Sequence, residues 1–343
     1  MDELNIIITY LQSFAREETN GFIHPNFLLN LVRTFRGSSA APNFQNVPKR
    51  EKEAMLITRK CILPRKGHQL MEIDFSSLEV RIAAAYHKDP TMLKYLRDGH
   101  DMHGDIAQQI FFLDNFDKSR PVHNTLRKAA KNGFVFAEFY GDWYKTCAHN
   151  LACTWGKLPT GRWQKGQGIP VENGLFLSDH LKANGIHSLS AFEDHLEKIE
   201  THFWNKRFPV YRDWKESHWK SYQKNGYVDL YTGFRCSGLM SKNDVINYPV
   251  QGAAFHCLLW SLTRLQFYLN YNKMDSRSVI QIHDAIVIDV HPDEVKQVFA
   301  IAKDIMTVGL PKHWTWINTP LEVEADLGQV DGSWASLKSY RPS

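Results

Sequence analysis

Two apolar segments that lie far apart in the chain each carry an aspartate where the apolar pattern ends. Residues 69–75 (QLMEIDF) alternate in polarity as a β-strand does, and Asp74 stands near the end of that run. Residues 278–290 (SVIQIHDAIVIDV) predict two short strands that turn at His283 and Asp284. Each carboxylate is flanked by Ile, Val or Phe, where an unpaired charge is costly. The pattern therefore predicts two independent turn aspartates or, if the segments meet, a site for divalent cations.

The rest of the chain has helical periods without a strand–helix–strand rhythm, which favours an α+β fold over a doubly wound sheet. Residues 33–50 predict a loop because Gly, Ser, Pro and Asn are frequent there. Residues 155–169 are Gly-rich with three basic residues and no acid, and predict an exposed, mobile basic loop. The ranges expected to be helical are 3–17, 77–87, 123–145, 189–224 with a break at Pro209, and a helix opened by Pro292.

Composition limits the classes of function. The 343 residues carry a formal net charge of +4, which permits a polyanionic partner without requiring one. Five cysteines without a C-x-x-C pair disfavour a disulfide framework or a zinc ribbon, and His100 and His103 lack a third ligand at a convincing spacing. The N-terminus carries acids where a signal peptide has positive charge, and no run of 18 apolar residues occurs. We therefore expect a soluble intracellular protein.

Two segments combine basic and aromatic residues. Arg127 and Lys131 share one helical face, and Phe136 and Tyr140 have the same spacing of four. A cationic pair followed by an aromatic pair suits a triphosphate with a base beside it, but the pattern alone favours a solvated basic turn next to a core stripe. Residues 202–224 carry six Lys and Arg, two acids and seven aromatics. They predict either a nucleic-acid-binding surface or a core stripe with a solvent-exposed basic face.

Several short motifs stand in the order found in family A (DNA polymerase I-type) DNA polymerases, and the resemblance covers roughly residues 25–330. The segment from Asp74 to Arg81 (DFSSLEVR) resembles the first palm motif, D-[YF]-S-x-x-E-x-R. Arg127-x3-Lys131 and Phe136-x3-Tyr140-Gly141 resemble the finger-helix motif. The other matches are Asn247-x-Pro249-x-Gln251-Gly252, Ile282-His283-Asp284, the run from Arg36 to Pro48, Asp101-Met102-His103, and Gly226-Tyr227-Val228 with Gly233-x-Arg235.

The resemblance implies a right-hand polymerase fold with an antiparallel palm sheet, helical fingers and a thumb that is largely missing. The implied segments are 1–50 as a residual thumb helix and connecting loop, 51–115 as the first part of the palm, 116–225 as fingers with the basic Gly-rich insertion, and 226–343 as the second part of the palm.

The resemblance also implies a role for each matching residue. Asp74 and Asp284, with Phe75, would hold two Mg²⁺ ions for phosphoryl transfer to a primer 3′-hydroxyl. Lys131 would act as a general acid on the pyrophosphate, and Glu79 would crowd a ribose 2′-hydroxyl. The implied nucleotide-binding residues are Arg127, Lys131, Phe136, Tyr140, Glu79 and His103. The implied DNA-binding residues, which would read shape rather than sequence, are Arg36, Asn43, Gln45, Arg81, Asn247, Gln251 and His283.

The sequence departs from the family pattern in two informative places. Ala285 stands where the family usually has Glu, so we expect altered rather than abolished activity. The finger helix is one residue longer between Lys131 and Phe136, which turns Phe136 by about 100°. We predict a π-bulge near Gly133 that restores the face; the alternative places Val135 in the Phe role.

Only 73 residues precede Asp74, which is room for at most a final thumb helix. We expect a second polypeptide that supplies a thumb and a 3′–5′ exonuclease, or a longer gene. The expected activity is template-directed DNA synthesis in a replication system, viral by its divergence, with primer–template DNA and dNTPs as partners, in bacterial or infected-cell cytoplasm and away from membranes. The alternative class is a non-catalytic, DNA-binding polymerase relic or replication scaffold. A two-metal nuclease needs acid clusters on shared elements, for which we see only single Asp residues.

Overall fold

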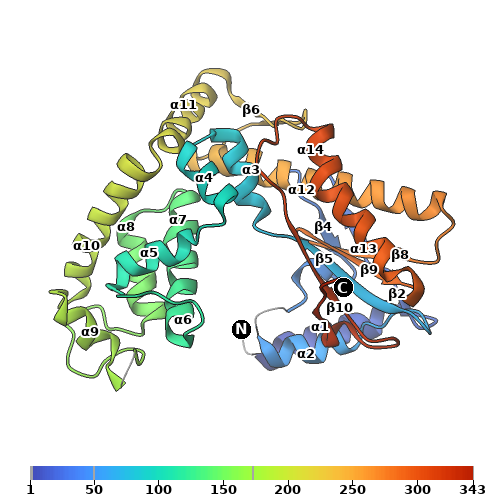
Figure 1. Ribbon diagram of the computed structural model, residues 1–343, viewed down its shortest axis with the longest axis horizontal. Helices are drawn as coiled ribbons and strands as arrows, with labels where there is room; N and C mark the ends of the chain where they lie inside the picture. Colours follow the sequence, from blue (N-terminus) through green and yellow to red (C-terminus); the bar gives the residue numbers. More distant parts are fainter. Residues whose placement is uncertain (1–2, 49–50, 172–173, 343) are drawn as a thin grey trace. The chain divides into compact units, whose positions relative to one another are not determined.

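The computed structural model describes residues 3–48, 51–171 and 174–342. The largest sheet among them has five antiparallel strands in the order β11-β10-β5-β9-β8 (Figure 1). Together with the many helices, this sheet confirms the α+β fold predicted from the sequence. Its strands are β5 (Gln69–Phe75), β8 (Arg277–Ile282), β9 (Ala285–Val290), β10 (Val323–Leu327) and β11 (Lys338–Ser339).

The chain divides into two units. The first comprises Met1–Tyr86, Tyr227–Gly238 and Tyr248–Ser343 and contains the large sheet. The second comprises His87–Gly226 and Leu239–Asn247 and is mainly helical. None of the helices in the described part of the chain is long and apolar enough to cross a membrane.

Strand β5 lies at the centre of the sheet because both of its edges are paired. Asp74 stands opposite Ala285 of β9 on one side and opposite Glu324 of β10 on the other. Residues that face each other on antiparallel strands point to the same side of the sheet. The β5 side chains therefore alternate between two faces, and all but Asp74 are buried.

Both faces of the sheet are covered. On one face Glu72 accepts a hydrogen bond from the Trp334 indole at 2.8 Å and pairs with Arg59 at 3.6 Å, so this buried charge is compensated. On the other face Met71 and Ile73 are fully buried. The apolar cluster around Glu72 contains Phe14, Phe44, Val47, Ile62, Leu70, Ile280, Ile282, Val287 and Trp334.

The first unit surrounds this sheet with helices and short strand pairs. The helices predicted over 3–17 and 77–87 are present. The helical elements are α1 (Glu3–Glu17), η1 (Phe44–Asn46), α2 (Lys52–Lys60), α3 (Leu78–His87), α12 (Lys242–Tyr271, shared with the second unit), η6 (Pro292–Glu294), α13 (Val295–Asp304), η7 (Ile305–Gly309), α14 (Leu310–His313) and η8 (Trp334–Ser336). The paired short strands are β1 (Glu18–Thr19) with β2 (Phe22–Ile23), β3 (Asn26–Leu28) with β4 (Ser38–Ala40), and β6 (Tyr227–Asp229) with β7 (Arg235–Ser237).

The second unit confirms the predicted helix break at Pro209, where α11 begins. Phe203, Phe208 and Tyr211 of the aromatic–basic segment 202–224 are buried, whereas its other four aromatic side chains are half-buried, so only part of this segment belongs to the core. The elements are α4 (Pro90–Asp98), α5 (Met102–Phe111), α6 (Pro121–Ala130), η2 (Lys131–Val135), α7 (Phe136–Phe139), α8 (Tyr144–His149), η3 (Asn150–Trp155), α9 (Leu177–Ala183), α10 (Leu189–His202), η5 (Phe203–Arg207) and α11 (Pro209–Asn225).

The segment 123–145 is not one continuous α-helix. Its middle, η2, is a π-helical turn, which confirms the bulge predicted near Gly133. A Cβ at Gly133 would lie 2.9 Å from Leu151 Cδ2, so a neighbouring side chain packs directly against this turn. After α7 the chain leaves the helix before α8 begins, a break that the sequence pattern did not predict.

The basic Gly-rich segment 155–169 was predicted to be an exposed loop, and this is wrong for two of its side chains. Leu158 and Trp163 are 3% and 2% exposed. The Trp163 backbone N–H also donates to the His187 carbonyl at 2.9 Å. The segment is therefore anchored by two buried side chains, while its basic side chains are exposed: Lys157, Arg162 and Lys165.

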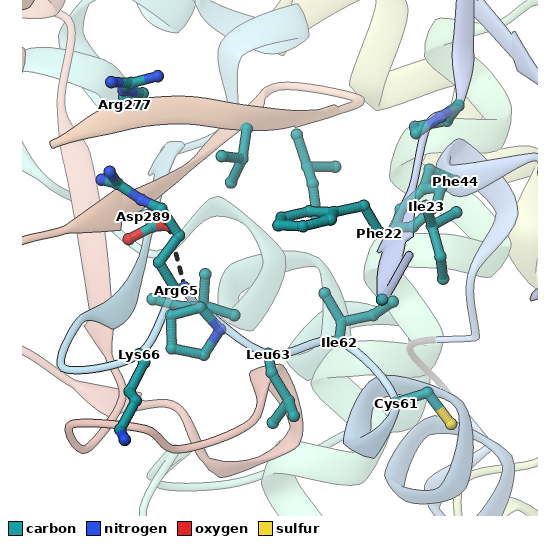
Figure 2. Close-up of a pocket in the computed structure, with 16 residues that line it drawn as sticks. Phe22, Ile23, Phe44, Cys61, Ile62, Leu63, Arg65, Lys66, Arg277 and Asp289 are labelled. Atoms are coloured by element: carbon teal, nitrogen blue, oxygen red, sulfur yellow. Dashed lines mark hydrogen bonds and ion pairs between the residues drawn. The ribbon is translucent and has the colours of Figure 1, made fainter. Parts of the chain in front are cut away.

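An apolar pocket of about 540 Å³ opens beside strand β8. Figure 2 shows Phe22, Ile23 and Ile62 around it, with Arg65 and Asp289 joined at one side. Asp289 lies at the end of the β8–β9 hairpin away from the His283–Asp284 turn. The pocket is therefore separate from the site built on that turn.

Candidate active site

The end of strand β5 and the turn between β8 and β9 lie side by side. The backbone N–H of Phe75 donates to the Asp284 carbonyl oxygen at 3.2 Å, and Asp74 stands opposite Ala285. Both aspartates are partly buried. The sequence left open whether these two acidic segments meet, and the structure brings their backbones together.

Two residues beside these aspartates have a left-handed backbone, with φ of +54° at Ser77 and +50° at His283. This conformation is costly for residues other than glycine and is often kept at functional sites. Ser77 lies in the turn between β5 and α3, which begins at Leu78 with Glu79 in its first turn. His283 forms the two-residue turn that sets Asp284 beside Phe75.

A cavity of about 320 Å³ lies beside Asp284. On its wall, Arg36 and Glu79 form an ion pair at 3.6 Å. Gln45 donates to the Gln281 side chain at 2.8 Å, and Gln281 donates to the His283 carbonyl at 2.9 Å. Asn43 is exposed just before η1. The cavity is lined by Arg36, Leu78, Glu79, Gln251, Ala254, Phe255, His283 and Asp284.

Arg81 is not among the residues that line this cavity, and its guanidinium is buried and ion-paired. Its side chain is 8% exposed, and it pairs with Glu322 at 3.0 Å. Its Nε donates to the Ser76 carbonyl at 2.8 Å, and another nitrogen donates to the Pro320 carbonyl. The guanidinium thus ties the end of β5 to the segment before β10. The DNA contact that the family resemblance implies for Arg81 stays a prediction.

The oxygen donors at this site fit a hard divalent cation. Asp74 and Asp284 offer carboxylates, and Phe75 can offer only its backbone oxygen. Within residues 3–48, 51–171 and 174–342, no group of three or more His, Cys, Asp and Glu side chains could hold a metal. Mg²⁺ commonly takes one or two carboxylates and completes its shell with water and substrate phosphates, whereas structural zinc takes four protein ligands. The donor set therefore suits Mg²⁺ better than zinc.

In the second unit, the predicted nucleotide-binding side chains gather around the π-turn. Arg127 Nε donates to the two Asp101 carboxylate oxygens at 2.9 and 2.6 Å. The Lys131 ammonium lies 5.1 Å from the centre of the Phe136 ring, and the His103 ring contacts the same ring at 5.6 Å. Sequence reasoning noted Asp101 only as part of a motif, because nothing local indicates that it holds Arg127.

The group formed by Arg127, Lys131 and His103 has too little negative charge beside it to balance its cations. Burial lowers the pKa of Lys131, and the neighbouring Arg127 lowers it further. Burial also lowers the pKa of His103 to about 4, with Lys131 and Arg127 adding to the effect, so the imidazole is neutral at pH 7. The His103 Nδ1 atom is buried and has no hydrogen-bond partner in the described part of the chain. An anionic ligand would favour the protonated forms of these groups.

Tyr140 lies at the end of α7 and is 36% exposed. Its ring contacts the Phe136 ring edge to face at 6.3 Å, as the spacing of four residues predicts. Asn247 donates to the Tyr140 carbonyl at 3.2 Å. Gly141 has φ of +93°, and a Cβ there would fall 2.2 Å from Asn243 Oδ1. The start of α12 is therefore packed tightly against the turn that follows Tyr140.

The chain is similar to known DNA polymerases. A model described as DNA polymerase family A matches residues 3–157 and 193–335. The thermostable DNA polymerase I of Thermus thermophilus is 27% identical over 97% of this chain and 35% of that protein. DNA polymerase I of Lactococcus lactis subsp. cremoris is 24% identical over 91% of this chain and 31% of that protein. The chain thus spans about a third of the length of these curated relatives.

A solved structure shows the same fold. The POL domain of Pol1 from M. smegmatis, in complex with DNA primer-template and dNTP, superposes with a TM-score of 0.72. The sequence identity is 21%, and the match covers 97% of this chain and 52% of that chain. The segment 158–192, which includes most of the basic Gly-rich insertion, lies outside the match to the family model.

Proposed function

Since the chain belongs to DNA polymerase family A, we propose that it adds deoxynucleotides to a primer 3′-hydroxyl in the order set by a template strand. The observation that carries this proposal is the meeting of the Asp284 turn with the Asp74 end of β5. The cationic and aromatic group around the π-turn supports it. We assign the sheet-containing unit to the palm and the helical unit to the fingers.

Asp74 and Asp284, with the backbone oxygen of Phe75, would hold two Mg²⁺ ions. When bound, such ions lower the pKa of the primer hydroxyl and neutralise charge on the triphosphate. The contribution of the chain itself is rigid placement. Strand β5 is paired along both edges, and Arg81 ties its end to the neighbouring segment. Both carboxylates are therefore held on backbone that does not need to move when substrate binds.

Arg127, Lys131 and His103 form the proposed triphosphate-binding group. Asp101 holds the Arg127 guanidinium through Nε, which leaves its terminal nitrogens to donate to phosphate oxygens. The lowered pKa makes Lys131 a stronger acid than an ordinary lysine. We assign Lys131 as the general acid that donates a proton to the leaving pyrophosphate oxygen.

Phe136 and Tyr140 are the proposed neighbours of the nascent base pair, and Glu79 is proposed to disfavour a ribose 2′-hydroxyl. Arg36 holds Glu79 in place through their ion pair. The remaining proposed contacts to primer–template DNA are Arg36, Asn43, Gln45, Asn247, Gln251 and His283. A viral setting and a second polypeptide with a thumb and a 3′–5′ exonuclease stay predictions, which copurification from the native host tests.

Primer extension by the purified chain is the direct test of the proposed function. With a primed template, dNTPs and Mg²⁺ the parent is expected to extend the primer, and EDTA is expected to stop it. Ala285→Glu is expected to change the extension rate by no more than roughly tenfold, because the two principal carboxylates are already present. A parent that binds primer–template but never extends it with Mg²⁺ would instead support a non-catalytic relic.

The basic side chains of the insertion are expected to contribute to DNA affinity through phosphate contacts. Replacing Lys157, Arg162 and Lys165 together by Ser is expected to reduce the slope of log affinity against log salt by roughly 2 to 3. The buried Leu158 and Trp163 stay in place, so the segment keeps its anchors. Fluorescence anisotropy with labelled primer–template at several salt concentrations measures the slope. An unchanged slope would contradict a DNA contact here, and a control variant replaces the exposed Lys296, Lys303 and Lys312 by Ser.

A further inference from the structure

Several elements of the second unit converge on Glu138, a buried residue of α7 that the proposed function does not use. Glu138 is 1% exposed. The Trp204 indole N–H of η5 donates to its Oε2 at 2.7 Å, and the Cys147 thiol of α8 donates to its Oε1 at 3.6 Å. Lys215 of α11 donates to the Glu138 backbone carbonyl at 3.4 Å and lies 3.5 Å from the centre of the Trp204 ring.

The carboxyl groups of Glu138 and Glu200 of α10 interact side chain to side chain. Ionised carboxylates have only acceptor oxygens, so a hydrogen bond between them requires a proton on one of the two groups. Glu200 is fixed in turn by the Tyr144 backbone N–H, which donates to its Oε1 at 2.9 Å. Burial raises the pKa of Glu138 to about 8, and the nearby Glu200 adds to the shift. Below pH 8 the pair therefore keeps one proton.

Glu138 lies on the opposite side of α7 from the two aromatic side chains assigned to nucleotide binding. Two residues along a helix correspond to a rotation of about 200°, so Glu138 points away from both Phe136 and Tyr140. Helix α7 has four residues between the π-turn and the break at Tyr140. So short a helix has little stability of its own, and its orientation depends on what packs behind it.

We propose that Glu138 is a positioning residue: the proton it shares with Glu200 ties the rear of α7 to α10 and so fixes the direction in which Phe136 and Tyr140 are presented. The inference rests on the proposed nucleotide-binding role of those two side chains. Loss of the shared proton places two negative carboxylates side by side in a buried region. Affinity for dNTP should therefore fall as the pH rises through the range in which that proton is lost.

The sign of the pH dependence follows from the direction of the shift. The ordinary pKa of Glu138 is 4.5 and the folded value is higher, so its stabilising contribution is full below pH 4.5 and is lost as pH rises through about 8. Burial lowers the pKa of Lys215 to about 8, so that group changes stability only above pH 8, where stability rises with pH. The other charged or titratable groups near the cluster are His87, Asp142, Glu197, Glu216 and Lys242.

The test compares the full-length parent with Glu138→Gln, which copies the protonated form. A Gln amide donates to Glu200, and its oxygen accepts from Trp204. The first readout is the thermal unfolding midpoint, which needs no catalysis. Glu138→Gln is expected to lie within about 2 °C of the parent at pH 5 and at least about 4 °C above it at pH 8. Asp194→Asn, which removes an exposed carboxylate from α10, is the matched control and should show no such change with pH.

The second readout is the dissociation constant for Mg–dNTP, measured beside the KM for dNTP. From pH 6.5 to 8.5 the parent's dissociation constant is expected to rise at least about threefold, while that of Glu138→Gln stays flat. Glu138→Val, which makes no tie, should bind dNTP weakly at every pH. Parallel unfolding profiles for parent and Glu138→Gln would overturn the shared proton. If the unfolding profiles differ as expected but the parent's affinity for dNTP does not change with pH, the positioning role would be overturned. A chain that binds no dNTP would overturn the positioning role together with the proposed function.

Discussion

Asn in place of Asp74 is expected to reduce Mg²⁺-dependent primer extension at least about 10³-fold and to change primer–template affinity less than about twofold. The substitution keeps the size of the side chain and removes the negative charge that would hold the ions. Asp74 stands on a strand paired along both edges, so the backbone has no reason to move. Asp284→Asn is expected to behave alike, because its turn is bonded to the same end of β5.

Single-turnover extension rates and DNA binding at one salt concentration measure both effects. Asp326→Asn is the matched control, because it removes an exposed carboxylate from β10, opposite Glu72 of β5. Its extension rate should stay within about twofold of the parent. If Asp74→Asn and Asp284→Asn each kept more than about a tenth of the parent's rate, these carboxylates would not be the metal ligands.

The elements that carry the candidate active site could be predicted because local patterns determine them. Strand β5 and the turn at His283 and Asp284 follow from alternating polarity and its interruption. The π-turn followed from counting the residues between Lys131 and Phe136 and asking how one helical face could still be shared. The strand and the turn need only neighbouring residues, whereas the π-turn also needs the spacing that the family pattern gives. The meeting of Asp74 with Asp284 needed more, and only the similarity to a known family suggested it.

Other features depend on partners that are remote in the chain, and sequence reasoning missed them. Arg81 belongs to a motif associated with the active site, but its guanidinium is bound by Pro320 and Glu322, which pack beside it only in the folded chain. Glu138 looks like an ordinary helical acid between aromatic residues, and its burial is decided by α10 and α11. Residue type and spacing do not show which groups bind Arg81 or that Glu138 is buried, because both depend on how the folded unit is assembled.

Gly252→Ala is expected to lower the free energy of unfolding by about 1–3 kcal/mol, which is the usual cost of overpacking. This loss is expected even though Ala stabilises a helix by roughly 1 kcal/mol relative to Gly. A Cβ on Gly252 would lie 2.3 Å from the Thr34 backbone oxygen and 2.6 Å from Leu230 Cδ2. Because the first of these atoms belongs to the backbone, α12 or the segment around Thr34 must shift. Arg36 lines the candidate cavity together with Gln251, so affinity for primer–template should fall as well.

The control for this substitution is Gly309→Ala, which sits in the same unit. Gly309 has φ of −63°, and the nearest atom to an added Cβ is Trp260 Cη2 at 3.6 Å, an ordinary contact. That variant should be neutral or gain up to about 1 kcal/mol. Urea unfolding gives both free energies, and anisotropy gives the DNA affinity. If Gly252→Ala proved as stable as Gly309→Ala, α12 would not pack against Thr34, and the placement of Arg36 beside Gln251 would have to be abandoned, because the same contact holds both sides of the cavity together.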